Sequence, residues 1–228
     1  LAVAAIPEGL PAAMTITLAI GVSRMVKRKA IIRKLPAVET LGSTTVICSD
    51  KTGTLTENQM TVMEIFAGNR KFNVFGSGYN TDGEIKYQDK VVRIDFSKAF
   101  RFCMKAGYLC NDSKLLNIDG RNTVQGDPTE GALIVSAVKA NLDETLVVKQ
   151  RPRLDTIPFE SEYQYMATLH KTEKFPVIAV KGAVEKLANM CSDMLDEKDN
   201  IVPFDKQAIM GVAEEMASRG LRVLAFGL

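Results

Sequence analysis

The sequence has little net charge, few cysteines and a single histidine. Its 228 residues carry 29 basic and 27 acidic side chains, a net charge of +2, so no excess of positive charge points to a nucleic-acid partner. The four cysteines include no CxxC pair, which excludes a zinc ribbon and a secreted disulfide framework. We expect free, buried thiols at Cys48, Cys103, Cys110 and Cys191. His170 is predicted to lie on a strand and to have no catalytic role.

Charge is nearly absent from the first 22 residues. From Leu1 to Val22 the only charged side chain is Glu8, and about 20 apolar residues span a bilayer. Six basic residues and no acidic one follow: Arg24, Lys27, Arg28, Lys29, Arg33 and Lys34. This cluster favours the cytoplasmic side and, because it follows the run, argues against a signal peptide. We expect a transmembrane helix in a piece of a longer protein; a buried core helix is the alternative.

The apolar run contains the sequence IPEGLP at Ile6–Pro11. Pro7 has no N–H, so the carbonyl of Val3 loses its helical partner, and Gly9 tolerates irregular backbone. A carboxylate such as Glu8 is costly at membrane depth and usually marks an ion path. Freed carbonyls and this carboxylate would form an oxygen-rich cation site that suits calcium. The alternative is a proline-kinked helix in which Glu8 pairs with a neighbouring helix.

A short β-branched run, TTVIC at Thr44–Cys48, predicts a buried strand. Asp50 follows it, and the carboxyl end of a parallel strand is a common place for chemistry. An ionised carboxylate can attack a phosphoryl group and form an aspartyl phosphate. The next residues would provide positive charge, hydroxyl groups and close backbone approach to phosphate oxygens: Lys51, Thr52, Gly53 and Thr54.

The sequence DKTGT at Asp50–Thr54 resembles the phosphorylation motif of the P-type ATPases, the ion-pumping branch of the haloacid-dehalogenase superfamily. Its flanks at Ile47–Val62 also match, and Leu1–Pro11 resembles the fourth transmembrane helix of the calcium pumps. The resemblance covers nearly the whole chain. Simple phosphatases of the superfamily carry a second Asp two residues after the nucleophile, where this chain has Thr52. The change favours a pump, whose phosphoenzyme must outlast a conformational change, over a soluble phosphatase.

Beyond Met60 the sequence alternates helical and strand patterns. Helical spacing connects Phe96, Phe100, Cys103, Met104 and Gly107, and separately Ile209, Val212, Ala213 and Met216, with Gly220 ending the second helix. Strands are predicted at Tyr165–Leu169, Pro176–Val180 and Leu221–Phe226, and a surface loop at Phe75–Asp89.

A further helix is predicted with its body at Gly131–Leu142. Asp127 can cap its start, and Pro128 suits the first helical position. Glu130 would complete a capping box by reaching back to the cap. The sequence around these residues therefore marks a helix N-terminus independently of any function.

Several residues beyond Met60 resemble the nucleotide pocket of the family's N domain. Val180–Ala183 (VKGA) resembles its KGA motif, in which Lys181 would face the ligand and Gly182 would admit the adenine. Phe159 and Ser161 match an FxS motif whose aromatic ring stacks on the base, worth about 1–3 kcal/mol. The resemblance therefore implies an adenine site on these two stretches.

The same resemblance implies that Thr129 and Glu130 border the adenine and that Arg222 meets the phosphates, to which a guanidinium is suited. At Gln164 the calcium pumps usually carry Lys; a neutral amide can hydrogen-bond to the nucleotide but contributes no Coulomb attraction. Each residue also has an ordinary explanation: Phe159 as core, Glu130 as helix cap, Lys181 as surface lysine and Arg222 as half of an ion pair. Their joint order after the DKTGT motif favours the pocket.

The resemblance implies an α/β protein in which an α+β nucleotide-binding domain is inserted after the first strand of a haloacid-dehalogenase-like phosphorylation domain. The implied parts are a transmembrane helix (1–23), a cytoplasmic stalk (24–42), the start of the phosphorylation domain with a hinge (43–62) and the nucleotide-binding domain (63–228). The chain would be an integral membrane protein with its nucleotide-binding part in the cytoplasm.

The implied activity is ATP-driven cation transport. Asp50, Lys51, Thr52 and Thr54 would be catalytic, and Asp50 and Thr52 would hold Mg²⁺. Glu8 and the backbone at Val3, Ala4 and Ile6 would bind the transported cation, for which calcium is favoured. The partners would be ATP, the lipid membrane and the remaining domains of the same pump.

Several alternatives stay open at this point. A manganese, sodium/potassium-type or proton pump would carry the same phosphorylation motif. A soluble phosphatase and a non-catalytic nucleotide-binding module are the alternatives outside transport. We expect the chain by itself to bind nucleotide weakly and not to sustain ATP hydrolysis, because further parts of the pump are missing from it.

Overall fold

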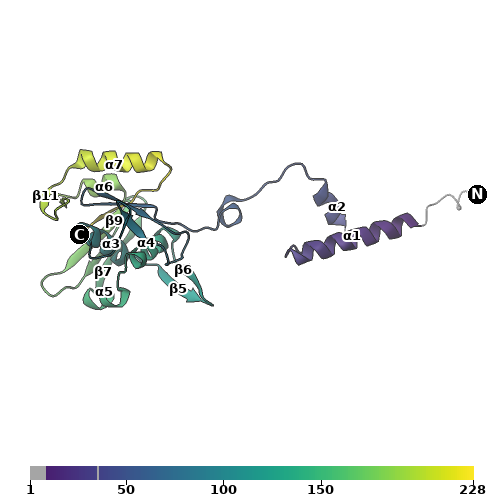
Figure 1. Cartoon of the computed structure of the whole chain (residues 1–228), viewed down its shortest axis with the longest axis horizontal. Coiled ribbons are helices and arrows are strands. Elements are labelled where there is room, and N and C mark those ends of the chain that lie inside the picture. Colours follow the sequence, from purple (N-terminus) through teal and green to yellow (C-terminus); the bar gives the residue numbers. More distant parts are fainter. Residues whose placement is uncertain (1–8, 35) are drawn as a thin grey trace, which may run out of the picture. The chain divides into compact units, whose positions relative to one another are not determined.

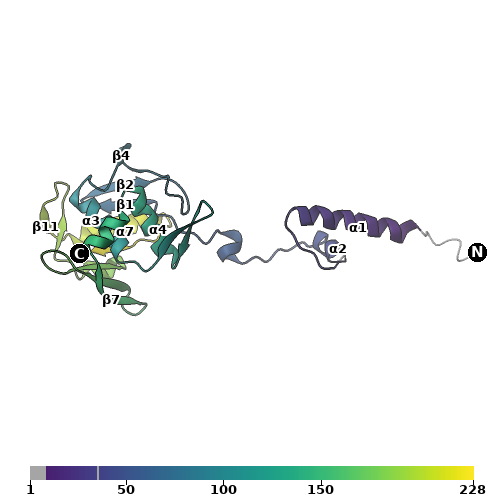
Figure 2. The same cartoon turned by 90° about the horizontal axis from the view of Figure 1, so that it is seen from below.

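The computed structural model describes residues 9–34 and 36–228. Contacts divide the chain into two compact units, 1–57 and 58–228, and the elements of each are drawn in Figures 1 and 2. The first unit contains α1 (Gly9–Lys27), α2 (Pro36–Gly42) and a turn, η2 (Lys51–Leu55). The division between the units falls inside the segment predicted to be a hinge.

Helix α1 has the length and composition to cross a membrane, and it is the only such helix among the residues that the structure describes. It has 19 residues, none of them buried against the rest of the chain. Arg24 and Lys27 lie in its last turn, where positive charge is favourable for the helix dipole.

The prediction of a buried strand at 44–48 is wrong for this structure. These residues form no regular element, and Val46 and Ile47 are 76% and 87% exposed. A strand exists through ladder hydrogen bonds to a neighbour, and no described residue pairs with this segment. Cys48 is therefore exposed rather than buried.

The second unit is built on two antiparallel four-stranded sheets. The first has the order β1 (Glu64–Ala67), β2 (Arg70–Val74), β3 (Ile85–Tyr87) and β4 (Lys90–Val92). The second has the order β12 (Ala225–Gly227), β9 (Val177–Gly182), β8 (Tyr165–His170) and β7 (Arg153–Glu160). Two hairpins complete the strands: β5 (Lys114–Ile118) with β6 (Arg121–Gln125), and β10 (Asp193–Leu195) with β11 (Ile201–Pro203).

Five helices accompany these strands: α3 (Lys98–Leu109), α4 (Pro128–Lys139), α5 (Glu144–Gln150), α6 (Val184–Ala188) and α7 (Lys206–Ser218). Helix α3 connects the two sheets, because it contacts β1 of the first sheet and β9 and β12 of the second, as well as α4. Helix α6 contacts β9, β12 and α7. The two sheets therefore share one helical layer centred on α3.

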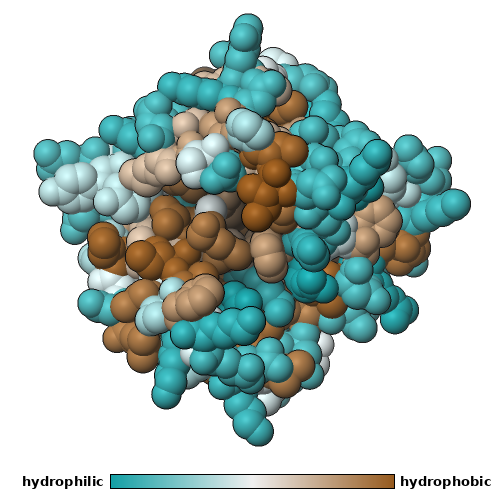
Figure 3. Space-filling model, turned by 90° about the vertical axis from the view of Figure 1, so that its left-hand side faces the viewer, coloured by the Kyte–Doolittle hydropathy of each residue, from teal (hydrophilic) through white to brown (hydrophobic). Residues whose placement is uncertain are grey.

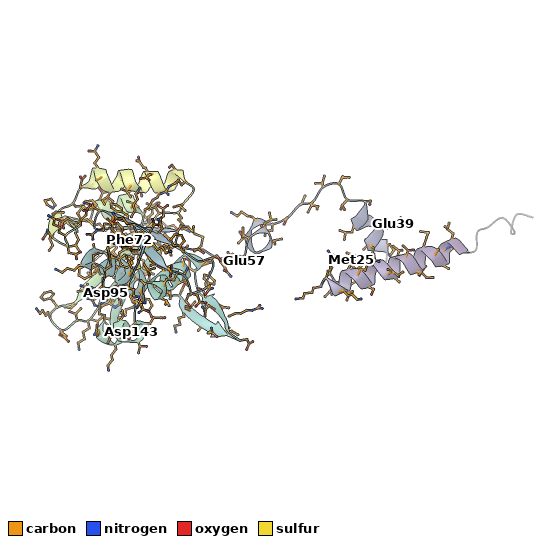
Figure 4. The ribbon with its side chains drawn as sticks, viewed as in Figure 1. Met25, Glu39, Glu57, Phe72, Asp95 and Asp143 are labelled. Atoms are coloured by element: carbon orange, nitrogen blue, oxygen red, sulfur yellow. The ribbon has the colours of Figure 1, made fainter. Side chains whose placement is uncertain are left out.

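The core gathers around aromatic side chains on β2 and α3. Phe72, labelled in Figure 4, and Phe100 are fully buried, with ring centroids 4.7 Å apart. Phe96 and Tyr87 pack on Phe72 at 5.6 Å and 5.4 Å. Such pairs add about 0.5–1.5 kcal/mol beyond area burial. Phe100, Met104 and Gly107 of the predicted helical stripe are buried on α3, whereas Cys103 is partly buried and Phe96, which precedes the helix, is 39% exposed.

Helix starts follow the sequence signals. Ser97 accepts the amide of Phe100 at the start of α3, Asp127 accepts those of Thr129 and Glu130 at α4, and Asp205 accepts that of Ala208 at α7. A side-chain cap of this kind contributes about 0.5–2 kcal/mol. These caps place the α4 N-terminus, and with it Glu130, as the sequence indicates.

Three predicted boundaries differ from the structure. Helix α4 ends at Lys139, not Leu142, because Asn141 adopts φ +64° and the amides of Asn141 and Leu142 bond back to the carbonyls of Val138 and Ala137, a Schellman ending. Strand β12 begins only at Ala225, since its ladder with β9 has three residue pairs. The expected loop at 75–89 contains β3, which pairs with β2 of the first sheet and places Ile85 in the core.

Candidate functional site

The second unit contains an ion pair that is largely buried, formed by two residues of the predicted nucleotide site. Lys181 on β9 donates through Nζ to Oε1 of Glu130 on α4 at 2.6 Å, and the two side chains are 8% and 16% exposed. Two charges withdrawn from water are stable only when paired and supplied with further hydrogen bonds. Lys181 is therefore no surface lysine.

The second oxygen of Glu130 accepts three further hydrogen bonds. Oε2 accepts the amides of Asp112 and Ser113 at 2.9 Å and 3.1 Å, and the Ser113 hydroxyl at 3.2 Å. The predicted capping box is therefore wrong: the carboxylate points to a separate turn and to Lys181 instead of back to Asp127. The cap of α4 is the Asp127 side chain alone.

The turn that binds Glu130 is residues 109–113, at the end of α3. Asn111 fixes it from within, because its Oδ1 accepts the Ser113 amide and its Nδ2 donates to the carbonyl of Glu130 at 2.9 Å. Arg153 of β7 fixes it from outside, donating to the Asp112 carboxylate and to the carbonyls of Leu109 and Asn111. We refer to residues 109–113 as the α3–β5 turn.

Thr129 and Arg222 lie together at the edge of this cluster. Arg222 Nη1 donates to Thr129 Oγ1 at 3.4 Å, and Arg222 is exposed, in the segment between α7 and β12. The guanidinium keeps donors free for another acceptor, since Arg carries five N–H groups. The structure thus joins four of the predicted residues, Thr129, Glu130, Lys181 and Arg222, from three separate stretches of sequence.

Gly182 and Gln164 meet for a structural reason. A Cβ on Gly182 would lie 2.5 Å from the carbonyl oxygen of Gln164 and 2.7 Å from Cβ of Tyr165. Gln164 is a turn residue with φ +61°, and its carbonyl accepts the amide of Ala183 at 3.0 Å. Glycine at 182 is therefore already required by the approach of β8 and its preceding turn.

Phe159 and Ser161 lie at the far strand of the second sheet and are exposed, Phe159 by 55%. The β7–β8 ladder pairs Glu160 with Tyr165, and the β8–β9 ladder pairs Tyr165 with Gly182. Two strand spacings, about 10 Å, therefore separate the Phe159 strand from Lys181. An exposed aromatic ring is free to stack on a base, unlike a core phenylalanine.

A large cavity of the second unit lies apart from the Lys181–Glu130 pair. It has a volume of about 970 Å³ and an apolar lining from β1, α3, α6 and α7; Thr129 and Arg222 border it, whereas Lys181 and Phe159 do not. Hydrophobic side chains gather around a hollow on the face drawn in Figure 3. Burial raises the pKa of Cys103 in this lining to about 12, so that thiol stays protonated at neutral pH.

The pKa values of the remaining thiols of this unit are shifted in the same direction. Burial raises the pKa of Cys110 and of Cys191 above the ordinary value. All four cysteines are free. The expectation of buried free thiols therefore holds for Cys110, while Cys103 and Cys191 are partly buried and Cys48 is exposed.

His170 ends β8, as the sequence predicted. It is buried, with Nδ1 3.0 Å from the carbonyl of Arg151 and Nε2 2.8 Å from the Thr168 hydroxyl. Burial is the main cause of a lowered pKa, so the imidazole is neutral at pH 7. Its two hydrogen bonds give it a sufficient structural role.

The Asp50 turn belongs to the first unit. Asp50 precedes η2, its Oδ1 accepts the amide of Lys51 at 2.7 Å, and the amide of Thr56 closes the turn on the Lys51 carbonyl at 3.1 Å. Gly53 has φ +75°, the left-handed region that glycine enters without strain. Asp50, Lys51, Thr52 and Thr54 are all exposed.

The predicted cation ligands cannot be placed. Glu8, Val3, Ala4 and Ile6 lie outside the described residues, which begin with Gly9 at the start of α1. Among the residues that are described, no group of three or more His, Cys, Asp or Glu side chains gathers as a metal site would require.

The sequence patterns did not predict a role for the α3–β5 turn or for Arg153. The run Asn111-Asp112-Ser113 after a helix is a signal for an Asx turn, and Asn111 makes that bond. The contact from Arg153, about 40 residues later in the chain, leaves no local signal.

Comparison with known proteins identifies the chain. The family described as P-type ATPase, cytoplasmic domain N, matches residues 99–228. A cation-transporting ATPase, pma1, of Synechocystis is 54% identical over 99% of this chain. A calcium-transporting ATPase of Bacillus subtilis is 37% identical, and the calcium-transporting ATPase type 2C member 1 of Bos taurus is 44% identical, each over 99% of this chain.

These matches cover 25%, 26% and 24% of the three relatives, so the chain spans about a quarter of their length. The α/β unit 58–228 is consistent with the domain that the family description names. The chain therefore belongs to the P-type ATPase family and is a fragment of a cation pump.

Proposed function

We propose that this chain is the part of a cation pump that binds ATP, accepts its γ-phosphoryl group on Asp50 and links that step to a membrane helix. The observation that carries the proposal is the cluster of Thr129, Glu130, Lys181 and Arg222, which the fold assembles from distant positions. A family domain of pumps that contains such a cluster is best explained as holding the nucleotide.

The cluster offers complementary chemistry for ATP. The Glu130 carboxylate and Lys181 ammonium present an acceptor and a donor to the adenine edge, Phe159 presents an exposed ring for stacking, and Arg222 presents a guanidinium to phosphate oxygens. Ser161, Gln164 and Gly182 lie on or beside the same strands. The neutral Gln164 gives a hydrogen bond where a lysine would give charge, so attraction for the phosphates rests on the exposed guanidinium of Arg222.

Asp50 has the chemistry of the acceptor. One of its carboxylate oxygens would form a bond to the γ-phosphorus while the bond from that phosphorus to the β,γ-bridging oxygen breaks, leaving ADP. Lys51, Thr52 and Thr54 would bind the phosphoryl oxygens. The exposed Asp50 and Thr52 carry hard oxygen donors that suit Mg²⁺, which when bound would neutralise phosphate charge. Thr52 leaves no general base beside the aspartyl phosphate.

For the transported cation we propose calcium, bound at Glu8 and the backbone of Val3, Ala4 and Ile6 in a lipid membrane. Two features support it: the carboxylate between two prolines, and relatives named calcium-transporting. The Synechocystis relative at 54% identity is named only for cation transport. Manganese is therefore the alternative that the test must include.

The test is phosphorylation of the full-length protein in membranes from radiolabelled ATP. We expect an acid-stable label that hydroxylamine releases, as an acyl phosphate requires, and that forms in calcium. Label that appears with manganese, sodium or potassium but not with calcium would reassign the cation. A protein that takes up no label with any of these ions would contradict the aspartyl-phosphate mechanism.

A further inference from the structure

The Glu130–Lys181 pair depends on residues that are not among those matched to the nucleotide pocket of the family. Three of the four hydrogen bonds to the Glu130 carboxylate come from the α3–β5 turn, through the Asp112 amide and both the amide and hydroxyl of Ser113. Only the fourth comes from Lys181. The direction of this carboxylate is therefore set mainly by the turn.

Both the backbone amide and the hydroxyl of Ser113 form hydrogen bonds at this position. The residue is buried, and its hydroxyl lies 3.2 Å from both Glu130 Oε2 and the carbonyl of Asp127. A Cβ on Gly126 would collide with the Ser113 side chain, so the segment just before the α4 cap closes tightly on it. Ser113 thus connects the turn to the cap and to the functional carboxylate at once.

Arg153 holds the turn from the neighbouring sheet. Its guanidinium donates to the Asp112 carboxylate and to the backbone carbonyls of Leu109 and Asn111. Three acceptors in different directions match the planar fork of arginine, and a lysine ammonium cannot satisfy them in the same way. Arg153 lies on β7, the strand that also carries Phe159.

We propose that Ser113 and Arg153 are positioning residues of the nucleotide site. Ser113 turns the Glu130 carboxylate so that its other oxygen meets Lys181, and Arg153 fixes the α3–β5 turn relative to the strand of Phe159. The proposal rests on the function proposed above. It adds that this turn, which lies outside the residues assigned to the nucleotide, sets the affinity for ATP.

The experiment uses the full-length protein in membranes and two routes to the Asp50 phosphate. Label from ATP, taken over a range of ATP concentrations, reports on the nucleotide site. Label from inorganic phosphate, by reversal of aspartyl-phosphate hydrolysis, reports on folded protein without a nucleotide. The variants are Ser113→Ala, Arg153→Ala and Arg153→Lys. The matched control is Ser136→Ala, a buried serine of the same helix as Glu130 that bonds only the Leu133 carbonyl.

We expect Arg153→Ala to raise the ATP concentration for half-maximal labelling by about tenfold and Ser113→Ala by about threefold, since two of the three turn donors remain. Arg153→Lys should fall between Arg153→Ala and wild type. Ser136→Ala should match wild type, and all four variants should take label from inorganic phosphate.

The outcomes separate the two proposals. An unchanged ATP requirement in Ser113→Ala and Arg153→Ala would overturn the positioning role. Parallel loss of label from ATP and from inorganic phosphate would also overturn it, because it would mean a general folding role. Wild-type protein that takes label from neither source would overturn the proposed function itself.

Discussion

The Asp50 turn and the Lys181–Glu130 pair are built in opposite ways. The turn consists of Asp50 and the five residues of η2 that follow it, all exposed, and its described hydrogen bonds stay between Ser49 and Thr56. The pair joins residues 51 positions apart, is largely buried, and draws its other bonds from a turn 17 and 18 positions before Glu130. The Asp50 turn therefore depends on neighbouring residues in the sequence, whereas the Lys181–Glu130 pair depends on long-range contacts in the fold.

This difference predicts different consequences of mutation. A change in the Asp50 turn removes a chemical group and leaves the rest of the molecule unaffected, because no packing depends on it. A change at Lys181 or Glu130 removes a proposed binding group and also leaves a buried partner unpaired, which costs stability. Phosphorylation, nucleotide binding and unfolding should therefore respond separately at the two places.

The largest effect is expected for Asp50→Asn in the full-length protein. An amide cannot form an acyl phosphate, so the label from ATP should disappear entirely, while binding of a fluorescent ATP analogue should be unchanged. The control is Asp89→Asn, in an exposed turn with φ +61° that asparagine also tolerates. Residual label in Asp50→Asn, released by hydroxylamine, would place the acceptor elsewhere.

Lys181→Met should come next, with a loss in both binding and stability. It leaves the Glu130 carboxylate without its cation in a site where the side chain is 16% exposed, which costs about 3–5 kcal/mol. The matched control is Lys71→Met, since Lys71 forms an ion pair with Glu215 that is open to solvent and contributes little. In the 228-residue chain by itself, tyrosine fluorescence during urea unfolding reports on this unit alone, because all five tyrosines of the chain lie in it and tryptophan is absent.

Equal unfolding midpoints for Lys181→Met and Lys71→Met would show that the buried ion pair contributes no more to stability than the exposed one. A destabilised Lys181→Met with unaltered ATP affinity would separate the pair from the nucleotide site. Lys181→Arg, which keeps the charge, should recover most of the stability.

Gly182→Ala should have a smaller effect. The added methyl meets the Gln164 carbonyl and Tyr165, and relieving this overlap by backbone shifts costs about 1–3 kcal/mol. Gly211→Ala in α7 is the control: nothing lies within 4 Å of its Cβ position, and alanine in a helix interior should add about 0.5–1 kcal/mol. Wild-type stability in Gly182→Ala would mean that the backbones of β8 and β9 can move apart at this point with little loss of stability.

The smallest effect concerns pH. Burial lowers the pKa of His170, so the unfolded chain binds its proton more readily, and stability should fall as pH drops below the unfolded value of about 6.5. One proton limits the slope to about 1.4 kcal/mol per pH unit. Urea midpoints across this range measure it, and His170→Gln should remove the slope because the sequence has no other histidine. A slope that survives in the variant would assign it to other groups.

The sequence predicted local features well and long-range ones poorly. The Asp127 cap, the α3 stripe from Phe100 onward, the α7 stripe and the β8 strand depend on neighbouring residues, and the structure contains them. The strand at 44–48 failed because a strand needs partners that the described residues do not provide.

The same distinction applies to the candidate site. The residues of the Lys181 cluster were found through their resemblance to a family, and the fold brings four of them together. The α3–β5 turn and Arg153 were missed, because a guanidinium that meets backbone carbonyls about 40 residues away leaves no periodic pattern. The capping box was wrong because Glu130 had better partners across the fold than along the helix.

The most direct measurement is photolabelling of the full-length protein with azido-ATP, followed by mapping of the modified peptide. The reagent fixes the adenine to whatever lies beside it, independently of later steps. We predict modification on the peptides that contain Phe159 or Lys181, abolished by excess ATP. Modification that ATP prevents equally well but that maps outside residues 58–228 would contradict the assignment of the nucleotide to this cluster.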